Sequence, residues 1–293
     1  RCLMLGIIGH AAIDIIRRGS TVKKSPGGAP TYCSFYLKQL GIEPLPITLV
    51  GSDFSDYLND YRVRGIVTDR IKVLSDCNST SYEITYYDTT RRLRLLARCR
   101  DFAIHDLYDL PDTVAVNPIA REVSLDVMRH IRGVTRFVGV DLQGFTRVFD
   151  ENNYVNVRIN IDDVVELMRY ADVIKASVDD VSMDEFNVLV SKYPDKVVVL
   201  TMGANGSILM RNGRKLRVST DGIVNVRDPT GAGDVLTCAL TYMLSRGEDL
   251  EWSFIFSNAA AVAKTMGEGP YGVISNGVVN EIADKLSSRL IRA

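Results

Sequence analysis

The chain has 293 residues, with 35 lysines and arginines against 36 aspartates and glutamates, so its formal net charge at pH 7 is -1. This balance gives no electrostatic reason to expect nucleic acid or an anionic membrane surface as a partner. Hydrophobic residues make up 46% of the chain and charged residues 24%, which excludes disordered and fibrous classes.

Short apolar runs alternate along the chain with segments of helical spacing. The runs lack period-two alternation, as expected for parallel strands covered on both faces. The alternation of strand and helix predicts βαβ units, and so a mostly parallel α/β sheet with helices on both faces. The predicted strands cover residues 3–8, 47–50, 114–116, 137–140, 173–174 and 197–200. The predicted helices cover residues 31–40, 161–170, 183–193, 231–246, 251–266 and 278–290.

Two stretches, residues 15–24 and 82–100, have strand character but no following helix. In the second stretch a turn at 88–91 separates two strand-like runs, and arginines then alternate with smaller or apolar residues. We expect an antiparallel flap that closes over a site. We interpret the arginines as a solvated outer face, with contact to an anionic substrate as the alternative. The inner face would carry Leu93, Leu95, Ala97 and Cys99, and the outer face Arg92, Arg94, Arg98 and Arg100.

Cysteines and histidines show no pattern of a metal or redox site. The chain has no C-x-x-C pair, and no histidine has a partner at metal-ligand spacing. We therefore expect no zinc and interpret the cysteines as small buried residues of a cytoplasmic protein. No apolar run reaches the roughly 20 residues that a membrane helix needs. The cysteines are Cys2, Cys33, Cys77, Cys99 and Cys238.

The strongest chemical signal is the sequence Asp-Pro-Thr-Gly-Ala-Gly-Asp at residues 228–234, at the start of a predicted helix. Glycines at a helix start let several backbone N–H groups point at one spot, at the positive end of the helix dipole. Such a place suits negative charge on a transferring phosphoryl group, and Asp234 can act beside it as a general base. A Gly-rich turn with a capping aspartate is the alternative interpretation.

These seven residues resemble the signature of the ribokinase-like (PfkB-type) carbohydrate kinases, and other motifs follow in that family's order. The resemblance spans roughly residues 3–290. It implies a single doubly wound α/β domain with a small β-sheet lid, whose strands are inserted at about residues 14–26 and 82–100. It also implies ATP as phosphoryl donor and a hydroxyl of a sugar, polyol or nucleoside as acceptor.

The same resemblance implies roles for individual residues. Asp234 would accept the hydroxyl proton, while the amides of Gly231, Ala232 and Gly233 would hold the phosphoryl group. Residues 201–206 resemble the family's T-x-G-x-x-G turn on the phosphate side, and residues 257–261 resemble its stretch along the nucleotide base. The implied sugar-hydroxyl contacts are Asp14, Gly27 and Gly28. The implied ATP-binding residues are Ser177, Thr201, Gly203, Gly206 and Asn258.

The sequence departs from the family's N-x-x-E motif, where Ser177 replaces the Asn and Asp180 the Glu. Both keep oxygen atoms that suit a hydrated Mg²⁺, so we expect Asp180 to organise Mg²⁺ through water. Asp228 matches the carboxylate that the family uses for a monovalent cation such as K⁺, and a simple turn residue is the alternative.

Three further residues shape the acceptor pocket that the resemblance implies. Tyr32 stands where many sugar kinases have an Asn, which favours stacking or shape selection over hydrogen bonding and makes ribose a doubtful acceptor. Gln143 and Arg147 follow a predicted strand, so they lie at the sheet edge where α/β proteins bind ligands. An ordinary surface loop is the alternative for both.

The residues together favour an ATP- and Mg²⁺-dependent kinase of a small hydroxylated molecule, forming a homodimer through its lid. The dimer is implied by the family and by the apolar flap face, which needs a cover. The alternative is a catalytically weak sugar- or nucleotide-binding sensor on the same fold. Retention of Asp234 and the complete glycine motif favours the kinase. Residues 6–10 lack the G-x-G-x-x-G spacing of a dinucleotide-dependent oxidoreductase.

Overall fold

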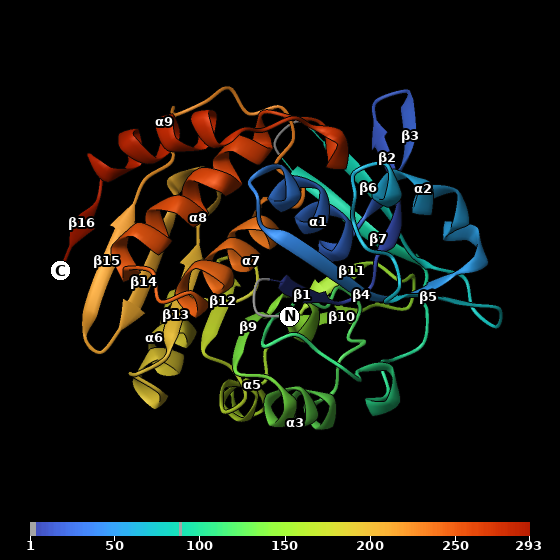
Figure 1. Cartoon of the computed structure of the whole chain (residues 1–293), viewed down its shortest axis with the longest axis horizontal. Helices are drawn as coiled ribbons and strands as arrows, with labels where there is room; N and C mark the ends of the chain where they lie inside the picture. Colours follow the sequence, from blue (N-terminus) through green and yellow to red (C-terminus); the bar gives the residue numbers. More distant parts are fainter. Residues whose placement is uncertain (1–3, 88–89) are drawn as a thin grey trace.

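The computed structural model describes residues 4–87 and 90–293, and its centre is a ten-stranded sheet (Figure 1). Seven of its strands, β13, β12, β9, β8, β1, β4 and β5, run parallel, and β14, β15 and β16 add an antiparallel edge beside β13. In spatial order the strands are β16 (Ile291–Arg292), β15 (Arg214–Val218), β14 (Ser207–Arg211), β13 (Val197–Thr201), β12 (Val173–Ser177), β9 (Phe137–Asp141), β8 (Thr113–Val116), β1 (Met4–Ile8), β4 (Glu43–Gly51) and β5 (Ile71–Leu74).

Helices cover both faces of this sheet and bury its side chains in two separate cores (Figure 1). This is the mostly parallel α/β sheet that the sequence predicts. One face carries α1 (Ala29–Gln39), α7 (Ala232–Ser245), α8 (Leu250–Thr265) and α9 (Asn276–Ser287), and the other α3 (Leu125–Val134), α5 (Ile161–Met168) and α6 (Met183–Lys192). The short helices are α2 (Leu58–Arg62), α4 (Gln143–Thr146), η1 (Ser52–Tyr57), η2 (Ile104–Asp106), η3 (Gly203–Asn205) and η4 (Gly269–Tyr271).

Helices α7 and α1, which pack together, both begin at a glycine with positive φ and without a side-chain cap, unlike the other long helices. A side-chain oxygen caps the first turn of α3 at Ser124, of α6 at Ser182 and of α8 at Asp249. Helix α7 has Gly231 at this position, in the left-handed conformation with φ of 81°, and no side-chain cap. Its first backbone amides are therefore open to a ligand.

A smaller four-stranded sheet stands beside the large one. Strand β2 (Ala12–Arg18) pairs antiparallel with β3 (Thr21–Gly27) and parallel with β6 (Thr80–Tyr87), which pairs antiparallel with β7 (Thr90–Ala97). These strands contain the two stretches predicted to form the flap. Asp88 and Thr89 of the predicted turn lie outside the described residues, as do Leu3 and Cys2.

The apolar face of the four-stranded sheet is covered by other parts of the same chain. Leu93 and Leu95 pack with Tyr82 and Ile84 against the loop after β8 and against the hairpin of β10 (Arg147–Phe149) and β11 (Val155–Val157). From sequence, we expected a second copy of the chain to cover this face. The structure removes that argument for a homodimer, because the hairpin already provides the cover.

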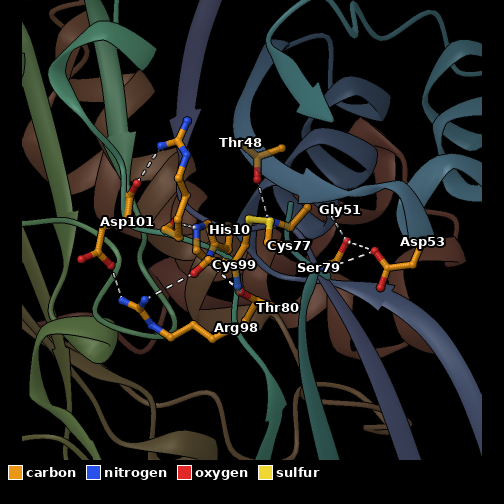
Figure 2. Close-up of a disulfide and its surroundings, with 12 residues drawn as sticks. His10, Thr48, Gly51, Asp53, Cys77, Ser79, Thr80, Arg98, Cys99 and Asp101 are labelled. Carbon is orange, nitrogen blue, oxygen red and sulfur yellow. Dashed lines mark hydrogen bonds and ion pairs between the residues drawn. A yellow bond between two sulfur atoms is a disulfide. The ribbon is translucent and has the colours of Figure 1, made fainter. Parts of the chain in front are cut away.

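A disulfide joins Cys77 and Cys99 at the base of the four-stranded sheet (Figure 2). Cys77 precedes β6 and Cys99 follows β7, so the bond closes the open end of the β6–β7 hairpin. The interpretation of all five cysteines as small buried residues was wrong for this pair, because strand pairing brings together two positions that are remote in sequence. Cys33 and Cys238 are free and buried, as expected.

Beside the disulfide, the buried His10 connects the strands that enter and leave the four-stranded sheet (Figure 2). Its Nδ1 lies 2.8 Å from the Thr80 hydroxyl, and its Nε2 lies 3.0 Å from the carbonyl oxygen of Arg100. The Cys99 amide donates to the same Thr80 hydroxyl at 3.1 Å. The beginnings of β2 and β6 and the end of β7 are thus held at one point.

The predicted strands and helices correspond to six strands of the large sheet and to α1, α5, α6, α7, α8 and α9. The other four strands of the large sheet, β5, β14, β15 and β16, are not among the predicted strands, and neither α3 nor the β10–β11 hairpin was predicted. Among residues 4–87 and 90–293, no helix combines the length and apolar character that a membrane crossing requires.

Candidate active site

A pocket lies between the four-stranded sheet and the start of α7, at the carboxyl ends of the central parallel strands. The predicted site residues Asp14, Gly28, Tyr32, Arg147, Gly231 and Asp234 all line it. Gln143, which the sequence also suggested, joins them. Arg91 also lines the pocket, as the alternative interpretation of the flap arginines allows. No site role was predicted for the other lining residues, which are Ala12, Tyr82, Ile84, Leu93, Ile119 and Thr230.

Asp234 lies in the first turn of α7 and faces this pocket. Burial, together with the charge of Asp141, raises its pKa to about 6. The Asn117 amide donates a hydrogen bond of 3.1 Å to Asp234 Oδ1, which opposes the shift. A carboxylate with this pKa is ionised at neutral pH and still basic enough to take a proton.

Asn117 is a site residue that the sequence analysis missed. It directly follows β8, so the strand end places it beside Asp234, and that position was the available signal. Its Oδ1 and the Tyr32 hydroxyl are buried without a hydrogen-bond partner among the described residues. Buried polar atoms without partners are costly, so both are suited to contact a bound molecule.

The start of α7 needs glycine at 231 for two reasons. The φ of 81° is strained for other residues, and a Cβ there would lie 2.4 Å from the Tyr32 ring. The Ala232 amide already donates to the Pro229 carbonyl at 3.2 Å, which weakens its part in the predicted anion hole. Gly233 and Asp234 supply the next amides of the uncapped turn.

Asp14 enters the pocket from β2 and is nearly fully buried. Burial raises its pKa to about 7, although Arg147 and Arg91 act in the opposite direction. Its carboxylate lies directly against Gly27, where a Cβ would be only 2.0 Å from Oδ2. This close approach explains why the glycine pair accompanies the aspartate.

Two guanidinium groups face the same pocket. Arg147 is buried, with Nη1 donating to the Ile119 carbonyl at 2.9 Å, and Arg91 reaches the pocket from β7. Neither lies within ion-pair distance of a carboxylate in the described residues. The interpretation of the arginines as a solvated outer face does not apply to Arg91, which shares the phase of Leu93 and so points inward.

A buried lysine lies behind the start of α7. The Lys175 Nζ is 3.1 Å from Asp141 Oδ2, and a Cβ on Gly233 would lie 2.8 Å from the same nitrogen. Burial alone would lower the Lys175 pKa, but Asp141, Asp180 and Asp234 together raise it. No role was predicted for this lysine, which directly follows the predicted strand at residues 173–174 and lies within the longer observed strand β12.

Asp180 is turned into the protein beside this lysine. Its Oδ2 accepts from the Ser177 amide at 3.3 Å, and its Oδ1 lies 3.5 Å from the Thr146 hydroxyl. Burial raises its pKa, and the charge of Lys175 limits the rise. The described residues contain no cluster of three metal ligands. Both Asp180 carboxylate oxygens lie against protein groups, so any contact of this residue with Mg²⁺ would run through a water molecule.

The predicted ATP residues lie outside the pocket, at the ends of the neighbouring strands. Ser177 and Thr201 pair at the ends of β12 and β13, and Gly203 and Gly206 flank the turn that follows. Asn258 is buried, its side chain accepting from Ser207 and donating to the Phe254 carbonyl, at 2.7 and 2.8 Å. These bonds leave Asn258 poorly placed for the predicted contact with a nucleotide base.

The four-stranded sheet contacts the Gly-rich loop directly. The Tyr86 hydroxyl lies 2.6 Å from the Thr230 hydroxyl, and the Arg18 guanidinium stacks 4.0 Å from the centre of the Tyr86 ring. Arg18 also lies 3.8 Å from Asp228 Oδ1. The tip of the sheet therefore closes the pocket over the start of α7.

Asp228 itself is buried and fully engaged within the protein. Its Oδ1 accepts from the Thr230 amide at 3.0 Å and its Oδ2 from the Gly269 amide at 2.8 Å. Burial would raise its pKa, but Lys264 and these two amides together lower it. The Asp228 carboxylate is therefore ionised, with the Lys264 ammonium as its nearest buried cation.

Comparison with known proteins identifies a family for the chain. The family model described as "pfkB family carbohydrate kinase" matches residues 4–274. A Pyrococcus horikoshii protein, provisionally named as a sugar kinase, is 25% identical over an alignment of 291 positions that covers 92% of this chain and 92% of the relative.

Solved structures share the fold. A pyrophosphate-dependent kinase of the ribokinase family, complexed with a pyrophosphate analog and myo-inositol, superposes with a TM-score of 0.77 at 21% identity, covering 92% of this chain and 97% of that one. Fructokinase from Vibrio cholerae, with fructose, ADP and calcium bound, gives 0.76 at 17% identity, covering 96% and 99%.

Proposed function

The chain belongs to the pfkB family of carbohydrate kinases, and we propose that it transfers the γ-phosphoryl group of ATP to a hydroxyl of a sugar, polyol or nucleoside. As a member of this family it is a phosphotransferase of small molecules. The observation that carries the finer proposal is the position of Asp234, which faces the pocket from the uncapped start of α7.

In the proposed reaction Asp234 takes the proton of the acceptor hydroxyl as the oxygen attacks the γ-phosphorus. The bond from phosphorus to the bridging oxygen breaks, and ADP leaves. The amides of Gly233 and Asp234 and the charge of Lys175 stabilise the negative charge on the phosphoryl oxygens. Catalysis therefore depends more on position and charge than on a strong base.

The donor lies along the ends of β12 and β13, next to Ser177, Thr201 and the turn at Gly203 and Gly206. Asp180 would hold Mg²⁺ through water, and the ion would neutralise charge on the donor phosphates. A structural neighbour is described as pyrophosphate-dependent. Because Asn258 is engaged inside the protein, pyrophosphate is a second donor to test beside ATP.

The acceptor occupies the pocket beneath the four-stranded sheet, which we propose acts as a lid. Asp14 binds acceptor hydroxyls, and the face of Tyr32 limits the shape of the pocket. Arg91 and Arg147 add two donors without carboxylate partners in the described structure, so polar or anionic groups on the acceptor find partners there.

The decisive test measures release of ADP, or of phosphate from pyrophosphate, against a panel of pentoses, hexoses, inositols, nucleosides and sugar phosphates. Asp234→Asn is expected to bind donor normally and to lose at least about 100-fold in turnover, because general-base catalysis is typically of this size. Glu248→Gln, an exposed acid beyond the other end of α7, is the matched control.

The alternative, a weak sugar- or nucleotide-binding sensor, gives a different result. A sensor would bind ATP or a sugar, but no acceptor would stimulate release by the wild type. Turnover of Asp234→Asn within tenfold of wild type would contradict the role proposed for this carboxylate.

A further inference from the structure

A buried ammonium group lies where the sequence predicts a monovalent cation. Lys264, in the last turn of α8, is 0% exposed. Its Nζ donates a 3.0 Å hydrogen bond to the Asp228 carbonyl oxygen and lies 3.9 Å from Asp228 Oδ2. The ring centres of Tyr32 and Tyr36 are 5.2 and 5.6 Å from this nitrogen. Oxygen atoms and aromatic faces thus surround the charge, as they surround bound cations.

The Lys264–Asp228 pair fixes the Gly-rich loop that leads into α7. The amides of Arg227 and Asp228 donate to the Thr265 carbonyl, at 2.8 and 3.0 Å, which ties the loop to the end of α8. The Asp228 carboxylate accepts the amide of Thr230, directly before Gly231. The position of the first turn of α7 therefore depends on this buried pair.

The residues present do not fit a separate K⁺ at this place. A K⁺ held by Asp228 would use its carbonyl and carboxylate oxygens, which are the atoms that the Lys264 ammonium contacts. A second cation would place two buried positive charges beside one carboxylate, and the second charge would lack a partner. Burying such an uncompensated charge is strongly unfavourable.

We propose that Lys264 is a positioning residue whose ammonium takes the place of a monovalent cation at Asp228, so that the enzyme needs no K⁺. The inference rests on the proposed kinase function for its effect on turnover. The ammonium and K⁺ carry the same charge, so the loop is held in both cases. Here the cation is covalently part of the chain and cannot be removed by exchange of salt.

The first experiment compares wild-type turnover in potassium chloride and in tetramethylammonium chloride at equal ionic strength. Tetramethylammonium is too bulky to enter a buried site. Equal rates are expected, whereas a rate that rises and saturates with K⁺ would overturn the proposal.

The second experiment compares Lys264→Ala with Lys264→Met in the chlorides of potassium, ammonium and tetramethylammonium. Lys264→Ala opens a space beside Asp228, so in tetramethylammonium its turnover is expected to fall about 10- to 100-fold, the cost of a misplaced catalytic loop. Potassium or ammonium ions enter the space and restore turnover. Lys264→Met fills the space with an uncharged side chain, and neither ion restores its activity. An alanine variant that responds equally to all three salts would contradict the role.

Thermal unfolding provides a readout that needs neither donor nor acceptor. Potassium is expected to raise the melting temperature of Lys264→Ala above its value in tetramethylammonium, because an ion that binds only the folded state stabilises it. Wild type is expected to melt at the same temperature in both salts. This comparison of wild type remains decisive even if the alanine variant fails to fold, and it separates failure of this inference from failure of the proposed reaction.

Discussion

Asp14 and Asp234 share one pocket, and the protein raises the pKa of both above the ordinary value of 3.8, to about 7 and about 6. Burial is the main cause in each case. Between pH 4 and pH 7 the folded chain keeps protons that the unfolded chain releases. The free energy of unfolding contributed by these groups therefore falls as pH rises through this window.

Replacement of Asp14 by Asn tests how much ionisation of this buried carboxyl destabilises the folded protein. Asp14→Asn removes a carboxylate that must ionise while buried, so it is expected to raise the melting temperature at pH 8, by about 2 °C for each kcal/mol gained in the free energy of unfolding. At pH 4, where the wild-type carboxyl is neutral, little gain is expected. Acceptor binding is expected to weaken at either pH, because the hydroxyl contacts of Asp14 are lost.

The control for this experiment is Asp195→Asn, which removes an exposed carboxylate. Its effect on the melting temperature is expected not to change between pH 4 and pH 8. An equal gain for Asp14→Asn at both values of pH would show that ionisation of Asp14 is not the source of the cost.

The site role of a residue could be predicted from sequence where it belongs to a motif of adjacent residues. Asp234 and Gly231 belong to one continuous motif, and both line the pocket. Asn117, Lys175 and Lys264 depend on partners more than 30 residues away, at Asp234, Asp141 and Asp228. Nothing in the local sequence distinguishes these three from ordinary strand-end or core residues.

At the scale of elements, the β6–β7 hairpin is held at its base by the Cys77–Cys99 disulfide and by His10 (Figure 2). The two cysteines are 22 positions apart. A cross-link that closes a loop of this size typically stabilises a fold by about 3 kcal/mol, through restriction of the unfolded chain.

Reduction of this disulfide is expected to lower the melting temperature and to leave the four-stranded sheet less firmly attached. Thermal unfolding with and without dithiothreitol measures the first effect, and hydrogen exchange over residues 80–87 measures the second. The variant with both Cys77→Ser and Cys99→Ser is the control, because its unfolding is expected to be insensitive to the reductant. A wild type that is equally insensitive would argue against a stabilising disulfide.

Elements with buried apolar runs or clear helical spacing could be predicted from sequence, and six of the seven parallel strands and the six matching helices belong to this group. Helix α3 buries Val127, Met128 and Ile131, as many residues as the predicted α5, so its helical pattern was present in the sequence and was missed. Strands β10 and β11 are three residues each, so they show no alternation. Their existence depends on the four-stranded sheet that they cover.

At the scale of the whole molecule, the order of strands gathers the site. Strands β8, β9, β12 and β13 are neighbours, so Asn117, Asp141, Ser177 and Thr201 meet at one edge of the sheet. The alternation of strand and helix predicts that such an edge exists. It does not predict which strands are neighbours, so the partners of each side chain became visible only in the folded chain.

The predicted homodimer also concerns the whole molecule, because it depends on which surface of the four-stranded sheet is free for a partner. With the inner face of the four-stranded sheet covered by β10 and β11, a partner that binds through this sheet would pack on its outer face or its edges. The outer face carries the exposed Arg92 and Arg94 and the Arg17–Glu83 ion pair, polar groups that would lose water in such a contact. We expect sedimentation in low salt to give the mass of one chain, and a concentration-independent dimer mass would refute this expectation.

In the proposed reaction, the contact between Tyr86 and Thr230 protects ATP from water. One hydrogen bond joins the cover of the pocket to the loop that begins α7. This bond helps to keep water away from the phosphoryl group and so limits hydrolysis of ATP without transfer to an acceptor. Tyr86→Phe is expected to waste more ATP per acceptor phosphorylated, and the exposed neighbour Tyr87→Phe is expected to leave this ratio unchanged.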